Sequence, residues 1–161
     1  MPSLEPAPAL STVMLTQSRV IRAPRARVYQ AWADPNFLKQ WFGPAAMFLA
    51  AVSLDVRVGG TYRIEMQMKP DAPPQARANM SQEAVVTGTY TQIVPDELLQ
   101  FTWEASWSPD ERSLVTISLR DITDGTELTL RQEKFDSEQS RDAHNQGWTR
   151  ALDNLTATIE A

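Results

Sequence analysis

The sequence predicts an α+β domain in which an antiparallel sheet of about six to seven strands packs against one long C-terminal helix. Between residues 52 and 130, segments of alternating apolar and polar residues follow one another, separated by turn signals, which is typical of strands with one buried face. Beyond them, side chains that suit a buried face recur at helical spacing, at His144, Trp148, Ala151, Leu152, Leu155 and Ile159. A series of hairpins followed by a single helix implies two packed layers.

The N-terminal part of the chain is predicted to hold one weak strand and two short helices. The strand is expected near residues 15–21, and Pro24 fits the first turn of the helix that follows, where its missing N–H costs no hydrogen bond. Asp34 and Pro35 then provide an N-cap and a first helical residue. A second helix is therefore expected over residues 36–42.

Strands are expected on both sides of the glycine pair at 59–60. Alternation places Val52, Leu54, Val56 and Val58 on the inner face before this turn, and Tyr62, Ile64, Met66 and Met68 on the inner face after it. Residues 70–80 contain three prolines and are expected to form a loop. Residues 83–94 form the next predicted strand.

The same alternation assigns the inner faces of the remaining strands. They carry Leu99, Phe101, Trp103, Ala105 and Trp107, then Val115, Ile117 and Leu119, then Leu128 and Leu130. Asp124 and Gly125 predict the last hairpin, because both residue types tolerate a positive φ. Asp136 and Gln139 have capping-box spacing at the start of the final helix.

Length and composition favour one domain and argue against several functions. The 161 residues suit a single domain, expected at residues 15–161 after a flexible tail at 1–14. A net charge of −5 without any run of Lys or Arg argues against a nucleic-acid partner. The chain has no cysteine, so disulfides and thiolate sites are excluded. No apolar run is long enough to span a membrane and no signal peptide is evident, so we expect a cytoplasmic protein.

Short motifs run in a fixed order along nearly the whole chain. They are Ala23-Pro24, Ala31-Trp32, Asp34-Pro35, Gln40-Trp41-Phe42-Gly43-Pro44, Asp55-x-Arg57-x-Gly59-Gly60, Gly88-x-Tyr90, Phe101-Thr102-Trp103, Gly125-Thr126-Glu127-Leu128-Thr129-Leu130 and His144-Asn145-x-Gly147-Trp148. With them, the chain resembles the bacterial relatives of the C-terminal domain of the activator of the heat-shock protein 90 ATPase. These relatives belong to the START-like, or birch-pollen-allergen-like, superfamily.

This resemblance implies the helix-grip fold, in which a curved sheet wraps around the C-terminal helix and leaves a cavity between them. It does not imply one function, because members are similar to lipid carriers, polyketide cyclases, hydrolases and co-chaperones. The chain departs from the family pattern at Gln132 and Lys134, where many relatives have a His and then a Gly. The departure removes a base that some chemistries would need at the first position.

The expected cavity lining combines the inward aromatic and apolar side chains with a few polar groups. The candidates are Trp41, Tyr62, Ile64, Met66, Phe101, Trp103, Trp107, Ile117, Leu130, Gln132, His144 and Trp148. From the residues alone, the aromatic face fits a filled core equally well, and only the resemblance favours a cavity. Trp41 and Phe42 fit a lid over the cavity mouth or a hydrophobic contact that fixes the second helix. Gly147 and Ala151 leave room beneath the final helix for a ligand or for close approach to the sheet.

Two inward polar residues are candidate functional groups. His144, the only histidine, fits a catalytic proton-transfer group or a donor to a ligand, and alternatively a structural histidine. Gln132 continues the inward register and needs a partner, which a ligand, a water molecule or neighbouring backbone would supply. One histidine without cysteine cannot form the usual zinc site, so we predict no metal and no cofactor.

Three functional hypotheses follow. The first is binding of a small, mostly apolar molecule (a lipid, an aromatic compound or a polyketide-like compound) oriented by Gln132, Tyr62 and His144. The second is a metal-independent enzyme of the cyclase or hydrolase type that uses His144, and we prefer binding to it. The third is a stress-related, co-chaperone-like interaction module, ranked lowest because the eukaryotic namesake uses a separate N-terminal domain. A homodimer is compatible with the sequence, but no residue pattern supports one.

Overall fold

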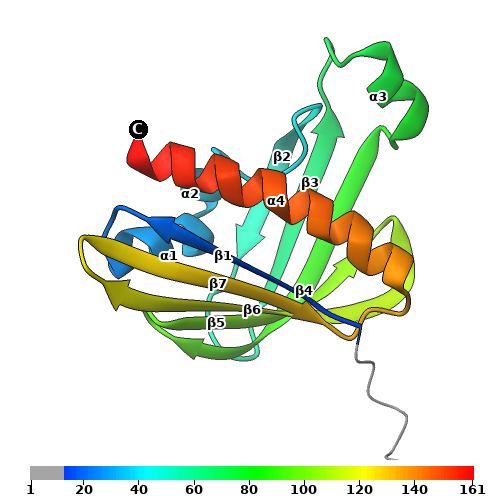
Figure 1. The fold of residues 1–161 in the computed structure, drawn as a ribbon. Helices are drawn as coiled ribbons and strands as arrows, with labels where there is room; N and C mark the ends of the chain where they lie inside the picture. The colour runs from blue at the N-terminus through cyan, green and yellow to red at the C-terminus, as the bar shows by residue number, and fades with distance from the viewer. Residues whose placement is uncertain (1–12) are drawn as a thin grey trace, which may run out of the picture.

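The computed structural model describes residues 13–161 and shows a curved sheet around a long helix (Figure 1). The sheet consists, in spatial order, of β1 (Leu15–Ile21), β7 (Gly125–Glu133), β6 (Ser108–Ile122), β5 (Leu98–Ala105), β4 (Glu83–Val94), β3 (Thr61–Met68) and β2 (Met47–Leu54). Every neighbouring pair of strands is antiparallel. The helices are α1 (Arg25–Ala33), α2 (Pro35–Leu38), α3 (Pro74–Asn79) and α4 (Glu138–Glu160). The predicted helix-grip fold is confirmed.

The concave face of the sheet and the inner face of α4 meet in one core. The buried positions of α4 are His144, Trp148, Ala151, Leu152, Leu155 and Ile159, which is the predicted stripe. On the strands, the predicted inner residues from Tyr62 to Met68, from Leu99 to Ala105 and from Val115 to Leu130 are buried in the same alternation. Of the predicted tail, residues 1–12 lie outside the described residues, and Val13 packs against the core.

Both predicted N-terminal helices form, with Pro24 at the N-cap of α1 rather than in its first turn, and with the second helix shorter than predicted. α1 buries Val28, Ala31 and Trp32. The Asp34 carboxylate caps α2 by accepting the backbone N–H of Asn36 at 2.8 Å. α2 ends at Leu38 rather than at the predicted Phe42, because the backbone changes to a tighter i to i−3 pattern, in which the Trp41 N–H donates to Leu38 at 3.3 Å.

The predicted inner residues Val52, Leu54 and Val56 pack against the core, but the strand in this region begins and ends earlier than predicted. β2 begins at Met47 and buries Met47 and Leu49, and a bulge follows Leu49. Val52, Leu54 and Val56 are only partly buried. Val58 lies in a turn before β3 and is 64% exposed, and Gly59 supplies the positive φ, 86°, that this turn requires.

Three further predictions are corrected. The segment 70–80 contains α3, which begins at Pro74 in the position where a helix needs no N–H. Ser137, and not Asp136, caps α4, since its hydroxyl accepts a first-turn backbone N–H at 3.0 Å. In the last hairpin, the positive φ belongs to Asp124, while the glycine after it already pairs within β7.

Gly88 shows how closely the strands approach beneath the core. A Cβ at this position would overlap the carbonyl oxygen of Thr102 on the neighbouring strand. The same carbonyl accepts a hydrogen bond from the Tyr62 hydroxyl at 2.6 Å. Because Gly88 on β4 has no side chain, the Tyr62 ring of β3 and the Thr102 carbonyl of β5 can both lie against its backbone.

We expect Gly88→Ala to lower the free energy of unfolding by about 1–3 kcal/mol, because β4 and β5 must separate locally to admit the methyl group. Urea unfolding followed by tryptophan fluorescence measures this change. Gly147→Ala is the control, since a Cβ there meets no atom within 4 Å. An unfolding midpoint for Gly88→Ala equal to that of the unmodified chain would contradict this account of the strand packing.

Candidate functional site

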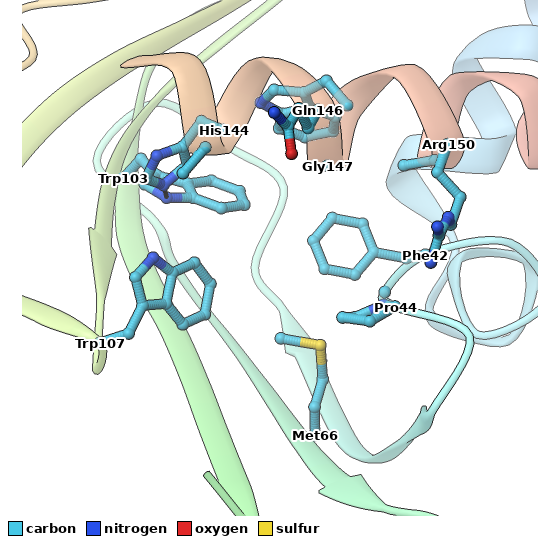
Figure 2. Close-up of a pocket in the computed structure, with 13 residues that line it drawn as sticks. Phe42, Pro44, Met66, Trp103, Trp107, His144, Gln146, Gly147 and Arg150 are labelled. Carbon is cyan, nitrogen blue, oxygen red and sulfur yellow. Dashed lines mark hydrogen bonds between the residues drawn. The ribbon is translucent and has the colours of Figure 1, made fainter. Parts of the chain in front are cut away.

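A pocket of about 360 Å³ opens beneath the N-terminal half of α4 (Figure 2). It is lined by Phe42, Gly43, Pro44, Met66, Trp103, Trp107, Ala143, His144, Gln146, Gly147, Trp148, Arg150 and Ala151. In Figure 2, Trp103 and Trp107 stand on one side of the open space, Phe42 and Arg150 on the other, and Met66 reaches in from the strands below. The volume lies within the range of small-molecule sites, roughly 300–1,000 Å³.

Trp148 connects the aromatic wall of the pocket with the packed core. Its ring centroid lies 5.4 Å from that of Trp103, 6.1 Å from that of Phe42 and 6.0 Å from that of Trp32. The rings meet at tilted or edge-on angles, which is the favoured geometry between aromatic side chains. Because Trp148 is itself buried, this wall is held in place by the core behind it.

The helical side of the pocket is formed by small residues. Ala143, Gly147 and Ala151 follow one another at intervals of one turn along α4. Gly147 is exposed, and a Cβ built on it would meet no atom within 4 Å. Of the two roles expected for Gly147, close approach of the helix to the sheet is therefore wrong, and open space beneath the helix remains.

Gln132 holds α4 against the sheet. Its side chain is fully buried on β7, and its Oε1 accepts the indole N–H of Trp148 at 2.7 Å. Its Nε2 donates to the hydroxyl of Ser113 on β6 at 2.8 Å. The partners of this inward amide are therefore two protein side chains, and not the ligand, water or backbone that the sequence suggested. Gln132 positions Trp148 and does not itself line the pocket.

Both ring nitrogens of His144 have protein partners. Nδ1 lies 2.8 Å from the carbonyl oxygen of Ser140, which can only accept a hydrogen bond, so this nitrogen carries the proton. The indole N–H of Trp103 donates to Nε2 at 3.3 Å. The imidazole thus forms part of the pocket wall, while its unprotonated nitrogen is already used to orient Trp103. This arrangement fits a structural role better than proton transfer.

A smaller cavity of about 20 Å³ lies deeper in the core. Its lining includes Trp32, Phe42, Tyr62, Ile64, Tyr90, Phe101 and Trp103. Phe42 and Trp103 also line the outer pocket, so these two rings separate the two spaces. Burial raises the pKa of the Tyr62 phenol well above its ordinary value, and the neutral hydroxyl donates to the Thr102 carbonyl. The inner space has room for about one water molecule.

The candidate lining residues divide into three groups. Met66, Trp103, Trp107, His144 and Trp148 lie around the pocket. Tyr62, Ile64 and Phe101 lie with Trp103 around the small inner cavity. Trp41, Ile117, Leu130 and Gln132 are buried in the packed core. Trp107 is 49% exposed in the turn after β5 and does not continue the inner face of that strand as predicted.

Trp41 and its neighbour Phe42 have different roles. Trp41 is 2% exposed, and its indole N–H donates to the Ala31 carbonyl at 3.0 Å, which fixes the turn after α2 against α1. Phe42 is only partly buried and forms one side of the pocket. Of the two roles considered for Trp41, the geometry supports the contact that fixes the helix.

Several lining residues were not among the candidates. Ala143, Gln146 and Arg150 lie with Gly147 on the flank of α4 beside the buried stripe, so a helical wheel could have placed them at the edge of the sheet-facing side. Pro44 and the glycine before it are placed by the turn after α2. No periodicity predicts the path of such a turn.

Neither metal ligands nor a membrane span is found in the part of the chain that the structure describes. No group of three or more His, Asp or Glu side chains there could hold a metal ion. No helix among residues 13–161 is long and apolar enough to cross a membrane.

We expect Gln132→Leu to lower the free energy of unfolding by about 2–3 kcal/mol, because the buried Trp148 N–H and Ser113 hydroxyl both lose their partner. Urea unfolding measures the loss. Gln67→Leu, on the exposed face of β3, is the matched control and should change stability by less than about 0.5 kcal/mol. Equal effects of the two substitutions would contradict the role assigned to Gln132.

Comparison with known proteins gives one family and many related structures. The family described as activator of Hsp90 ATPase homolog 1-like protein matches residues 22–160. Protein CV1439 of Chromobacterium violaceum is 28% identical with a TM-score of 0.78, over 92% of this chain and 98% of that one. An AHSA1-like protein of Aeromonas hydrophila is 23% identical with a TM-score of 0.73, over 91% and 92% of the two chains. CalU16 of Micromonospora echinospora is 25% identical with a TM-score of 0.65, over 91% and 75%. No curated protein sequence matches.

The family match covers the functional site as well as the fold. It begins directly after β1 and ends at the last residue of α4, so every residue that lines the pocket lies within it. The resemblance inferred from the ordered motifs is thereby confirmed. The chain belongs to the activator of Hsp90 ATPase homolog 1-like family.

Proposed function

We propose that the protein binds a small, mostly apolar molecule in the pocket between α4 and the aromatic wall formed by Trp103, Trp107 and Phe42. The size of the pocket and its lining support this function. Most of the lining side chains are aromatic or aliphatic, and a few polar groups lie at the edge, which is typical of small-molecule sites.

The observation that carries the proposal is the open space at Gly147. Glycine in the middle of a helix costs about 0.5–1 kcal/mol relative to alanine. Such a residue is usually explained by a neighbouring backbone that leaves no room for a Cβ, but here a Cβ would meet no atom within 4 Å other than those of the adjoining helix backbone. A requirement for free volume on the pocket side of α4 explains why the helix has no side chain at this point.

The enzymatic alternative has less support. A cyclase or hydrolase of this fold would need a base in contact with the ligand, and His144 is the only imidazole of the chain. Its two nitrogens face Ser140 and Trp103, so proton transfer would first require the loss of the hydrogen bond from Trp103. Binding requires no such change.

The family name raises a different alternative, activation of an Hsp90-type ATPase. Such an activity needs an outer surface that contacts the chaperone, whereas ligand binding needs the pocket. The two functions are therefore separable by a substitution that fills the pocket and leaves the outer surface of the sheet unchanged.

We expect the protein to bind N-phenyl-1-naphthylamine, a neutral probe that fluoresces in apolar sites, and Gly147→Leu to weaken this binding by at least about tenfold. The Cβ of the new side chain would meet no atom within 4 Å, and we expect the rest of the leucine to fill the space that Gly147 borders. Its melting temperature should equal or exceed that of the unmodified chain, because leucine is a far better helix former than glycine. Fluorescence titration and thermal unfolding measure the two effects.

Gly147→Ala is the matched control for this experiment. It removes the same glycine and adds one methyl group, so it should gain helix stability and keep most of the probe affinity. Failure of the unmodified chain to bind the probe, or equal probe affinities of the leucine variant and the unmodified chain, would contradict the proposed function.

A further inference from the structure

Among the described residues that line the pocket, Arg150 carries the single charged side chain. No Asp or Glu is among the described residues that line it. Figure 2 shows the Arg150 side chain leaving α4 and running beside Phe42 towards Pro44, at the edge of the open space. Gln146, one turn earlier on α4, is a neutral polar residue that also lines the pocket.

Like Arg22, whose side chain lies outside the pocket, Arg150 has no side-chain partner among the described residues. Eight other arginines form ion pairs with carboxylates, at Arg19, Arg25, Arg57, Arg63, Arg112, Arg120, Arg131 and Arg141. Arg27 stacks on Phe37, and Arg77 donates to backbone carbonyls. The Arg150 guanidinium has neither an ion pair nor a hydrogen bond within residues 13–161, so its five N–H donors remain available.

Resting on the proposed function, we infer that the ligand is an amphipathic carboxylate. Its apolar body lies between Phe42, Met66 and Trp103, and its carboxylate is held by Arg150 at the edge of the pocket. The planar guanidinium matches a carboxylate with two parallel hydrogen bonds. The unpaired Arg150 guanidinium carries one positive charge, which matches the one negative charge of a carboxylate. A phosphate monoester would carry close to two negative charges at neutral pH.

The net negative charge of the protein means that attraction of a carboxylate to the pocket has to come from Arg150. With a net charge of −5, the molecule as a whole repels anions. Any preference for an anionic ligand must therefore come from a local cation, and Arg150 is the cation in the pocket. A volume of about 360 Å³ lies near the lower end of the range for ligand sites, which favours one ring system or a single short chain over a lipid with two long chains.

A matched pair of ligands tests the inference. 2-Naphthoate and 2-naphthamide have the same ring system and nearly the same shape, but only the first is charged at pH 7. We expect the unmodified protein to bind the carboxylate about three- to tenfold more tightly than the amide, with a preference that narrows as salt is added. Isothermal titration calorimetry measures both affinities.

The variant Arg150→Gln should remove this preference by weakening naphthoate binding while leaving naphthamide binding within about twofold. Arg150→Lys should keep part of the preference, since it retains the charge and loses the planar fork. Arg120→Gln, on β6, changes the net charge equally outside the pocket and should keep the full preference. Glutamine is a good helix former, so the fold of the Arg150 variant is expected to persist.

Each result decides between distinct conclusions. Equal affinities of the unmodified protein for the two compounds, or a preference that survives Arg150→Gln, would overturn the carboxylate assignment. If N-phenyl-1-naphthylamine binds and naphthoate does not, the apolar pocket stands and the carboxylate assignment fails. If neither binds, the proposed function fails and the assignment fails with it.

Discussion

The hydrogen bond between the Trp148 indole and the Gln132 amide is the interaction on which the rest of the site depends. It joins the middle of α4 to β7 inside a mainly apolar core, at 2.7 Å. Because both groups are buried, their separation would leave two unsatisfied polar atoms, which costs more than the net contribution of one hydrogen bond to stability. This buried hydrogen bond therefore fixes the distance between α4 and the sheet, and that distance sets the depth of the pocket.

The two flanks of α4 explain why the pocket lies where it does. On one flank, Asn145, Thr149 and Asp153 contact the edge strand β1, where Gln17 donates to Asn145 and Arg19 pairs with Asp153 at 3.0 Å. Figure 1 shows β1 running beside the helix on this side.

On the opposite flank of α4, Ala143, Gly147 and Arg150 face the pocket. Polar contacts hold one flank of α4 against β1, and the small residues on the opposite flank leave the space that forms the pocket. The separation of the two flanks follows from helical periodicity, since positions three to four residues apart share a face.

The sequence predicted the parts of the fold that follow a simple period. Alternation identified the inner residues of β3, β5, β6 and β7, and helical spacing identified the buried stripe of α4. Both signals arise because a large share of each element faces one core. The start of β2 was missed because a bulge after Leu49 breaks the alternation, and Val58 was wrongly placed on the inner face because it lies in an exposed turn.

The candidate site was harder to predict than the fold. Aromatic side chains on an inner face look the same in sequence whether they fill the core or border a space, as Phe101 and Trp103 illustrate. The position of the space depends on where the turn after α2 places Phe42, and on how far α4 stands from β3. Both are products of tertiary packing. Arg150 was missed because an exposed arginine on a helix has no distinguishing pattern in one sequence.

The most direct test of this account is a crystal structure of the unmodified protein soaked with 2-naphthoate. The account predicts one bound molecule beneath α4, with its rings between Phe42 and Trp103 beside Gly147, and with its carboxylate against the Arg150 guanidinium. A naphthoate bound elsewhere on the protein, with the space at Gly147 filled by movement of α4 towards the sheet, would contradict it.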